Sequence, residues 1–272
     1  MMLDLAEHLK LISSPPDCGV RWQVEVALAI ADGAPIGGDF IVFDAPANMR
    51  RLQAVVVDAS GKGADAATRS LMLAGAIAGL LGEVPSEVLL PAVNRHILRL
   101  GWEEHFATAA HLDVDLETGE FRIGVAGHPA VARLHAGSGK WQLLRATGPA
   151  LGLLTDASWS QHRGRLAPGD TLVVVTDGVI EMPGEDLDVG LDRLLGQAEY
   201  LVLSGFAEGA ARLLDTRRDA GRDDAQVLVV AHQPVTHDAP LTATPLQRAR
   251  PADAQVAYPT EPGLADRVPQ QR

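Results

Sequence analysis

Four aspartates, each at the end of an apolar run or in a tight turn, constrain this chain more than any other feature. A strand that ends in Asp delivers a carboxylate to the rim of a sheet, and small neighbours let the backbone approach what it holds. Several carboxylates at one rim cannot all stay ionised without a cation, and hard cations choose oxygen ligands. The sequence therefore predicts a site for two Mg²⁺ or Mn²⁺ ions. The four are Asp39 in Gly37-Gly38-Asp39-Phe40, Asp58 after Val55-Val56-Val57, Asp177 after Val173-Val174-Val175-Thr176, and Asp223 in Arg222-Asp223-Asp224.

Composition excludes several other classes of protein. The chain has 272 residues, which fits one domain or one domain with a tail, and it is 47% hydrophobic but only 4% aromatic. Ala, Val and Leu must therefore fill the core. The net charge of -12 argues against a nucleic-acid binder, which needs a basic face. The single cysteine, Cys18, permits neither an internal disulfide nor a Cys-based zinc site.

The sequence shows no export or membrane signal. Residues 1–10 mix acidic and basic side chains among leucines and lack a basic region followed by an apolar stretch. The most apolar helix-like run, residues 71–81, is far shorter than the roughly 20 residues that a membrane span needs. We expect a soluble, cytoplasmic protein that binds no membrane.

Hydrophobic periodicity predicts both strands and helices. Residues 22–31 place Val24, Val26, Leu28 and Ile30 on one face at period two, which is typical of a strand. Residues 62–81 are rich in Ala and Leu without β-branched clusters, which favours a helix. The other predicted elements are a doubly buried strand over 51–58, helices over 85–100, 191–198 and 206–217, hairpins over 106–126 and 131–144, and strands over 171–176 and 225–231.

Hairpins rather than repeated βαβ units favour an α+β fold with antiparallel sheets. Two packed sheets with helices outside would bury the valine-rich strands on both faces. We expect a short lead-in over residues 1–20, one domain over 21–232, and a tail over 233–272. Seven of the 17 prolines lie in that tail, which has no periodic apolar pattern and is predicted to be disordered. It would solubilise the protein or bind a partner.

Taken singly, the motifs leave alternatives open. Gly37-Gly38-Asp39-Phe40 could be a plain turn, and a nucleotide cyclase would need an acidic residue in place of Phe40. Ser60-Gly61-Lys62-Gly63 lacks the spacing of a phosphate loop, although Lys62 could contact a phosphate. Asp177 could form a β-turn with an Asx hydrogen bond, and His128 could be a turn residue or an acid–base catalyst.

The ordered set of motifs is more specific than its members. Over residues 36–231 the chain resembles bacterial metal-dependent protein phosphatases of the PP2C superfamily (PPM), in the SpoIIE/RsbU branch of serine phosphatases. The motifs that carry the resemblance are Gly37-Gly38-Asp39-Phe40, Asp58-Ala59-Ser60-Gly61-Lys62-Gly63 with Ala66-Ala67, Phe106-Ala107-Thr108, Ala126-Gly127-His128-Pro129, Gly148-Pro149-Ala150-Leu151-Gly152, Pro168-Gly169-Asp170, Thr176-Asp177-Gly178-Val179-Ile180-Glu181 and Asp223-Asp224.

This resemblance implies an α/β/β/α sandwich with two Mn²⁺ or Mg²⁺ ions at one end of the sheets. It implies that Asp39 and Asp58 hold the pair, with Asp58 bridging both ions and the backbone carbonyl of Ala59 as a further ligand. Asp177 and Asp223 would complete the second ion's shell, with Asp224 beside it. The implied reaction is hydrolysis of phosphoserine or phosphothreonine, and the implied substrates are phosphorylated anti-sigma-factor antagonists of the STAS type.

Two departures and one rival interpretation bear on this expectation. Ile41-Val42 and Ala225-Gln226 stand where the family usually has an acid and a Thr, but neither place carries a primary ligand. The rival is a catalytically silent PP2C-fold module that binds a partner; such a module should have lost a metal aspartate. Control is expected from a homodimer contact or a regulatory subunit, acting through the helices predicted over 62–81 and 85–100.

Overall fold

A computed structural model describes residues 11–31, 37–61, 64–101, 105–182, 184–202, 206–217 and 223–234. Residues 1–10 of the predicted lead-in fall outside this part of the chain, and so do Lys62, Gly63 and residues 235–272 of the predicted tail. Gln233 is described, and its backbone N–H donates to the carbonyl of Arg21 at 2.8 Å. Within the described part, no helix is both long enough and apolar enough to cross a membrane.

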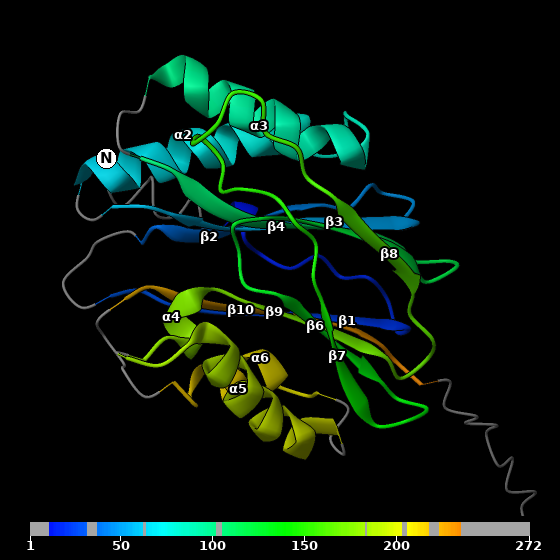
Figure 1. Ribbon diagram of the computed structural model, residues 1–272. Helices are drawn as coiled ribbons and strands as arrows, with labels where there is room; N and C mark the ends of the chain where they lie inside the picture. The colour runs from blue at the N-terminus through cyan, green and yellow to red at the C-terminus, as the bar shows by residue number, and fades with distance from the viewer. Residues whose placement is uncertain are drawn as a thin grey trace, which may run out of the picture. The chain divides into compact units, whose positions relative to one another are not determined.

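The ten described strands form two five-stranded sheets, and every strand pair in them is antiparallel. This arrangement confirms the α+β fold class, and Figure 1 shows the two sheets stacked on each other. Sheet A has the order β1 (Trp22–Ala29), β10 (Ala225–His232), β9 (Thr171–Val175), β6 (Val131–His135), β7 (Lys140–Leu144). Sheet B has the order β2 (Asp39–Asp44), β3 (Arg51–Ala59), β4 (Ala107–Asp115), β5 (Glu120–Ala126), β8 (Gln161–Arg165).

Helices cover the outer face of each sheet (Figure 1). The helices on sheet B are α2 (Ala64–Leu80) and α3 (Ser86–Leu100). Those on sheet A are α4 (Asp177–Ile180), α5 (Leu187–Val202) and α6 (Gly209–Leu214). Helices, sheet B, sheet A and helices therefore make four layers with three apolar interiors.

Strand β3 illustrates how the sequence fills these interiors. Val55 and Val57 pack under α2 and α3, whereas Val56 between them faces sheet A. All three are fully buried, as predicted for a strand covered on both faces. Because alternate side chains of a strand point to opposite faces, one run of valines serves two of the three interiors.

Three elements were not predicted, and one strand is less buried than predicted. Strand β2 is apolar on both faces, so it shows no alternation, and the polar strand β8 has no apolar face. Helix α4 is a single turn. In β1, Val24 and Val26 pack between the sheets, but Leu28 and nearby Ile30 are 42% and 40% exposed, because β1 lies at the edge of sheet A.

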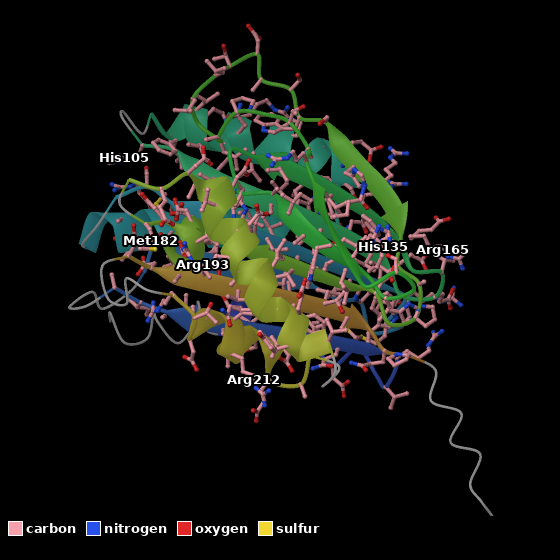
Figure 2. The ribbon with its side chains drawn as sticks, turned by 60° about the horizontal axis from the view of Figure 1, so that its bottom comes forward. His105, His135, Arg165, Met182, Arg193 and Arg212 are labelled. Atoms are coloured by element: carbon pink, nitrogen blue, oxygen red, sulfur yellow. The ribbon has the colours of Figure 1, made fainter. Side chains whose placement is uncertain are left out.

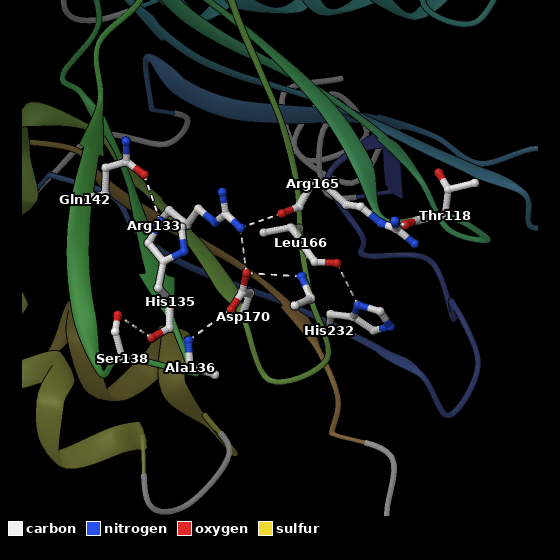
Figure 3. A network of polar contacts seen from close by, with 11 residues as sticks. Thr118, Arg133, His135, Ala136, Ser138, Gln142, Arg165, Leu166, Asp170 and His232 are labelled. Carbon is white, nitrogen blue, oxygen red and sulfur yellow. Dashed lines mark hydrogen bonds and ion pairs between the residues drawn. The ribbon is translucent and has the colours of Figure 1, made fainter.

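A buried ion pair ties the sheets together at one end (Figure 3). Arg133 of β6 lies 2.7 Å from the carboxylate of Asp170, and their side chains are only 12% and 4% exposed. The same carboxylate accepts hydrogen bonds from the backbone N–H groups of Ala136 and Ala167. Arg133 also donates to the carbonyl of Arg165 in β8, which belongs to sheet B. Asp170 of the Pro168-Gly169-Asp170 motif thus has a structural role.

Leucine at Gly75 and Gly79 of α2 is expected to leave the fold intact. A Cβ atom added at either position would meet no described atom within 4 Å, and glycine in a helix interior costs roughly 0.5–1 kcal/mol relative to alanine. Thermal unfolding should therefore show equal or higher stability. Mn²⁺ affinity and oligomeric state would test whether this exposed helix face controls the protein. If neither changes in the folded variant, α2 is scaffold only.

Candidate metal centre

The first two predicted aspartates face each other across neighbouring strands of sheet B. Asp39 begins β2 and Asp58 lies near the end of β3, and the two are direct partners in the antiparallel register. Like charges at directly opposite positions destabilise a sheet. Burial, followed by the charge of Asp58, raises the pKa of Asp39 well above its usual value. Without a cation, ionising both carboxylates at this end of sheet B is therefore unfavourable.

The other two predicted aspartates, Asp177 and Asp223, follow or precede strands of sheet A, and their charges act on Asp58. Burial raises the pKa of Asp58 to about 7, and the next causes are the charges of Asp177 and Asp223. Burial and the charge of Asp223 also raise the pKa of Asp177, which opens α4 directly after β9. Thus the ends of β3 and β9, together with the residues before β10, assemble one acidic cluster.

A threonine holds one of these carboxylates. The hydroxyl of Thr176 donates to Asp39 Oδ2 at 2.6 Å and accepts the backbone N–H of Gln226 at 2.8 Å. Thr176 is fully buried, so water cannot replace either bond. It connects β9 and β10 of sheet A with β2 of sheet B. Thr176 lies in the Thr176-Asp177-Gly178 motif, but that motif alone does not predict its contact with Asp39.

Asp224 fixes the backbone around Asp39. Its carboxylate accepts the N–H groups of Ala31 and Gly38, the second at 2.5 Å. A side chain at Gly37 would come within 2.8 Å of this carboxylate, and one at Gly38 within 2.6 Å of the Ala59 carbonyl oxygen. The two glycines are therefore needed for close packing, and the Ala59 carbonyl lies beside the turn that leads into Asp39.

The chain after β9 is packed as closely as the turn at Gly37-Gly38. A side chain at Gly178 would overlap the backbone carbonyl of Asp224. Glycine in the Asp177-Gly178 pair thus lets the first turn of α4 approach the residues before β10. The neighbouring Asp223 is exposed, and its carboxylate accepts the N–H of Asp224 at 3.0 Å.

The donor chemistry of this cluster fits divalent cations. All of its candidate side-chain ligands are carboxylates, which suit Mg²⁺ and Mn²⁺, and their mutual repulsion would be relieved by positive charge. Across the described ranges, no three His, Cys, Asp or Glu side chains are already spaced to hold one ion. Binding therefore requires these carboxylates to turn towards a common point, and the Thr176 bond to Asp39 Oδ2 leaves Oδ1 of that residue to do so.

His128 has a hydrogen bond within its own turn, and no hydrogen bond or ion pair between described residues joins it to the acidic cluster. Its ring is buried, and Nδ1 donates to the carbonyl of Pro129 at 3.2 Å. Burial lowers the pKa of His128 to about 4, so the ring is neutral at pH 7. The structure therefore supports the turn interpretation of His128. Lys62, the proposed phosphate contact, is outside the residues described.

Replacing Asp224 with alanine is expected to weaken metal binding without removing a predicted ligand. The backbone N–H groups of Ala31 and Gly38 would lose their acceptor, which costs about 1–3 kcal/mol for each donor left buried and unpaired. Calorimetric titration with Mn²⁺ and thermal unfolding would measure both effects. Asp156→Ala, at an exposed loop residue, is the matched control. Equal Mn²⁺ affinity of Asp224→Ala and the unmodified chain would contradict the role of Asp224.

Comparison with solved structures defines the class of protein to which this fold belongs. The RsbU and RsbW domains of a Mycobacterium tuberculosis protein match with a TM-score of 0.69 at 24% identity, over 78% of this chain and 60% of that chain. The PP2C phosphatase domain, with a regulatory fragment, of SpoIIE from Bacillus subtilis matches with a TM-score of 0.66 at 20% identity, over 78% and 63%. RsbX in complex with magnesium matches with a TM-score of 0.58 at 18% identity, over 77% and 94%. The fold is that of PP2C-type phosphatases.

The family follows from the sequence comparison. Residues 48–233 match the model of the stage II sporulation protein E (SpoIIE) family, and this is more than half of the chain. The chain therefore belongs to the SpoIIE family. A comparison with curated proteins gives no significant match. The chain spans less than two thirds of the Mycobacterium tuberculosis and Bacillus subtilis structures that it matches.

Proposed function

We propose that this protein is a metal-dependent protein phosphatase that hydrolyses phosphoserine or phosphothreonine. The observation that carries the proposal is the direct pairing of Asp39 with Asp58 in sheet B, with Asp177 and Asp223 acting on the same group from sheet A. A structural role alone does not explain this clustering, because each carboxylate makes its neighbours harder to ionise. Membership of the SpoIIE family supports the same reaction class.

Asp39, Asp58, Asp177, Asp223 and the Ala59 carbonyl would hold two Mn²⁺ or Mg²⁺ ions. Bound there, the ions would activate a water molecule for attack on phosphorus and neutralise charge on the phosphoryl oxygens. The protein's own part is to position the ligands. Thr176 fixes one oxygen of Asp39, and Asp224 fixes the Gly38 backbone that precedes it.

The proposed substrate is a regulatory phosphoprotein, such as an anti-sigma-factor antagonist of the STAS type. Support comes from the family and from the similarity to a structure that contains RsbU and RsbW domains. We place the phosphatase domain at residues 21–232. A second copy of the chain or a separate regulatory subunit would control it.

Hydrolysis of p-nitrophenyl phosphate by the purified chain is expected to require added Mn²⁺ or Mg²⁺. The proposed nucleophile is a water molecule, which attacks phosphorus at neutral pH only when a bound divalent ion lowers its pKa. The rate should be measured with each ion, after exhaustive chelation, and after the metal is restored. Full activity without metal would contradict the mechanism. Tight Mn²⁺ binding without turnover of this ester or of any phosphoprotein would instead favour the silent binding module.

A further inference from the structure

A hollow of about 810 Å³ lies on the outer face of sheet B, beside the first turn of α3. Its lining includes four arginines, Arg51, Arg122, Arg163 and Arg165, which we call the arginine groove. They come from β3, β5 and β8. In a chain with a net charge of -12, so many guanidinium groups around one hollow indicate a local preference for anions.

The acidic residues of the same hollow are largely engaged. Asp113 receives two hydrogen bonds from Arg51, at 2.5 and 2.6 Å, and a third from the Ser86 hydroxyl. The carboxylate of Asp115 accepts two N–H groups of its own turn, at 2.9 and 2.7 Å. The third acid, Glu120, stands opposite Arg165 in the strand register. None of these three acids forms an ion pair with the other two arginines of the groove, Arg122 and Arg163.

Arg122 and Arg163 are direct partners across β5 and β8. Such opposition of like charges is unfavourable unless an anion lies between them. Arg122 forms one exposed ion pair, with Glu87 at 3.5 Å, and the Glu87 side chain is 54% exposed. Among the described residues, none makes a hydrogen bond or an ion pair with the Arg163 guanidinium. Paired guanidinium groups with free N–H donors suit a phosphate dianion, which accepts several charge-assisted hydrogen bonds.

Strand β8 adds a second feature. It is the terminal strand of sheet B, so one of its edges pairs with no other described strand. An extended peptide can add to such an edge through main-chain hydrogen bonds while its side chains meet those of the edge strand. Arg163 and Arg165 are exposed on β8, and Figure 2 labels Arg165 at the far end of the molecule from His105 and Met182.

We propose that the arginine groove binds an acidic, phosphorylated peptide segment of a partner protein. The phosphate lies between Arg122 and Arg163, and the peptide backbone runs along β8. The groove is separate from the candidate metal centre, because Arg51 and Asp58 lie at opposite ends of β3, roughly 23 Å apart at about 3.3 Å per residue. The groove therefore holds a segment other than the one presented for hydrolysis.

Fluorescence anisotropy with a labelled acidic peptide that contains one phosphoserine tests this proposal. The full chain should carry Asp58→Asn and be kept in EDTA, so that the metal centre neither holds nor hydrolyses the phosphate. Arg163→Glu and Arg122→Gln are each expected to raise the Kd at least tenfold, and Arg163→Lys by less. Arg145→Glu, which alters an equally charged exposed residue beyond β7, should stay within twofold. Binding should weaken steeply between 50 and 200 mM salt.

Three results would overturn the proposal. One is equal affinity of Arg163→Glu and its parent. Another is equal binding of the same peptide without its phosphate, which would mean that the arginines only prevent edge-to-edge pairing of β8 with other strands. The third is competition by inorganic phosphate as strong as by the peptide. Arg163→Glu should also be made in a chain that retains Asp58. Its melting temperature and its Mn²⁺-dependent turnover should be unchanged, so that failure of the groove proposal can be told apart from failure of the phosphatase proposal.

Discussion

Replacing Asp58 with asparagine is expected to abolish metal-dependent turnover and to stabilise the metal-free protein at neutral pH. Asp58 stands opposite Asp39 and near the charges of Asp177 and Asp223, and we propose that it contacts both ions. Its removal takes one negative charge out of a crowded, partly buried cluster. Activity with Mn²⁺ should fall by several orders of magnitude, while the melting temperature measured in EDTA should rise.

The pH dependence of this stabilisation follows from the raised pKa. Asp58 has a pKa of about 7 in the folded protein and 3.8 in the unfolded chain, so the folded state holds its proton between these values. Stability of the metal-free protein therefore falls as pH rises from about 4 to 7, by on the order of 2–4 kcal/mol from this group. Asparagine lacks this titration. The stability gained by Asp58→Asn should thus grow over the same pH range.

Melting curves in EDTA at pH 4.5, 6 and 7.5 would measure the effect, with Asp156→Asn as the exposed control. A variant that melts lower than the unmodified chain at pH 7.5 would show that Asp58 is structural. Turnover that survives in a folded Asp58→Asn protein would instead remove Asp58 from the metal centre.

Replacing Asp170 with alanine is expected to destabilise the protein by about 3–5 kcal/mol, because it leaves the buried guanidinium of Arg133 without its carboxylate. The N–H groups of Ala136 and Ala167 lose the same acceptor. The melting temperature should drop by on the order of 10 °C for a domain of this size. Figure 3 shows how several segments meet at this one side chain.

Asp188→Ala is the matched control, since its pair with Arg145 is 58% exposed on both sides and should contribute at most about 1 kcal/mol. A double-mutant cycle with Arg133→Met isolates the coupling between Arg133 and Asp170. Similar losses of unfolding free energy for Asp170→Ala and Asp188→Ala would contradict the structural role of Asp170. Because Asp170 and Asp177 lie beyond opposite ends of β9, the Mn²⁺ affinity of the folded fraction should stay unchanged.

Local patterns were sufficient to predict most elements. The valine run of β3 and the turn between β4 and β5 are encoded by neighbouring residues, so periodicity and turn chemistry reveal them. The short helix α4 and the strands β2 and β8 were missed for a common reason. Each acquires its conformation from packing, as β8 does by pairing with β5, and none has a periodic apolar face of its own.

The same division applies to the candidate site. The sequence by itself determined that Asp58 and Asp177 stand where a valine-rich strand ends, because a run of apolar residues followed by a small-residue turn fixes that geometry locally. Only the tertiary structure decided what holds the carboxylates. Thr176 and Asp39 are 137 residues apart along the chain, and Asp224 and Gly38 are 186 apart. These contacts exist because two sheets stack, and the stacking depends on all three apolar interiors at once, which no local pattern records.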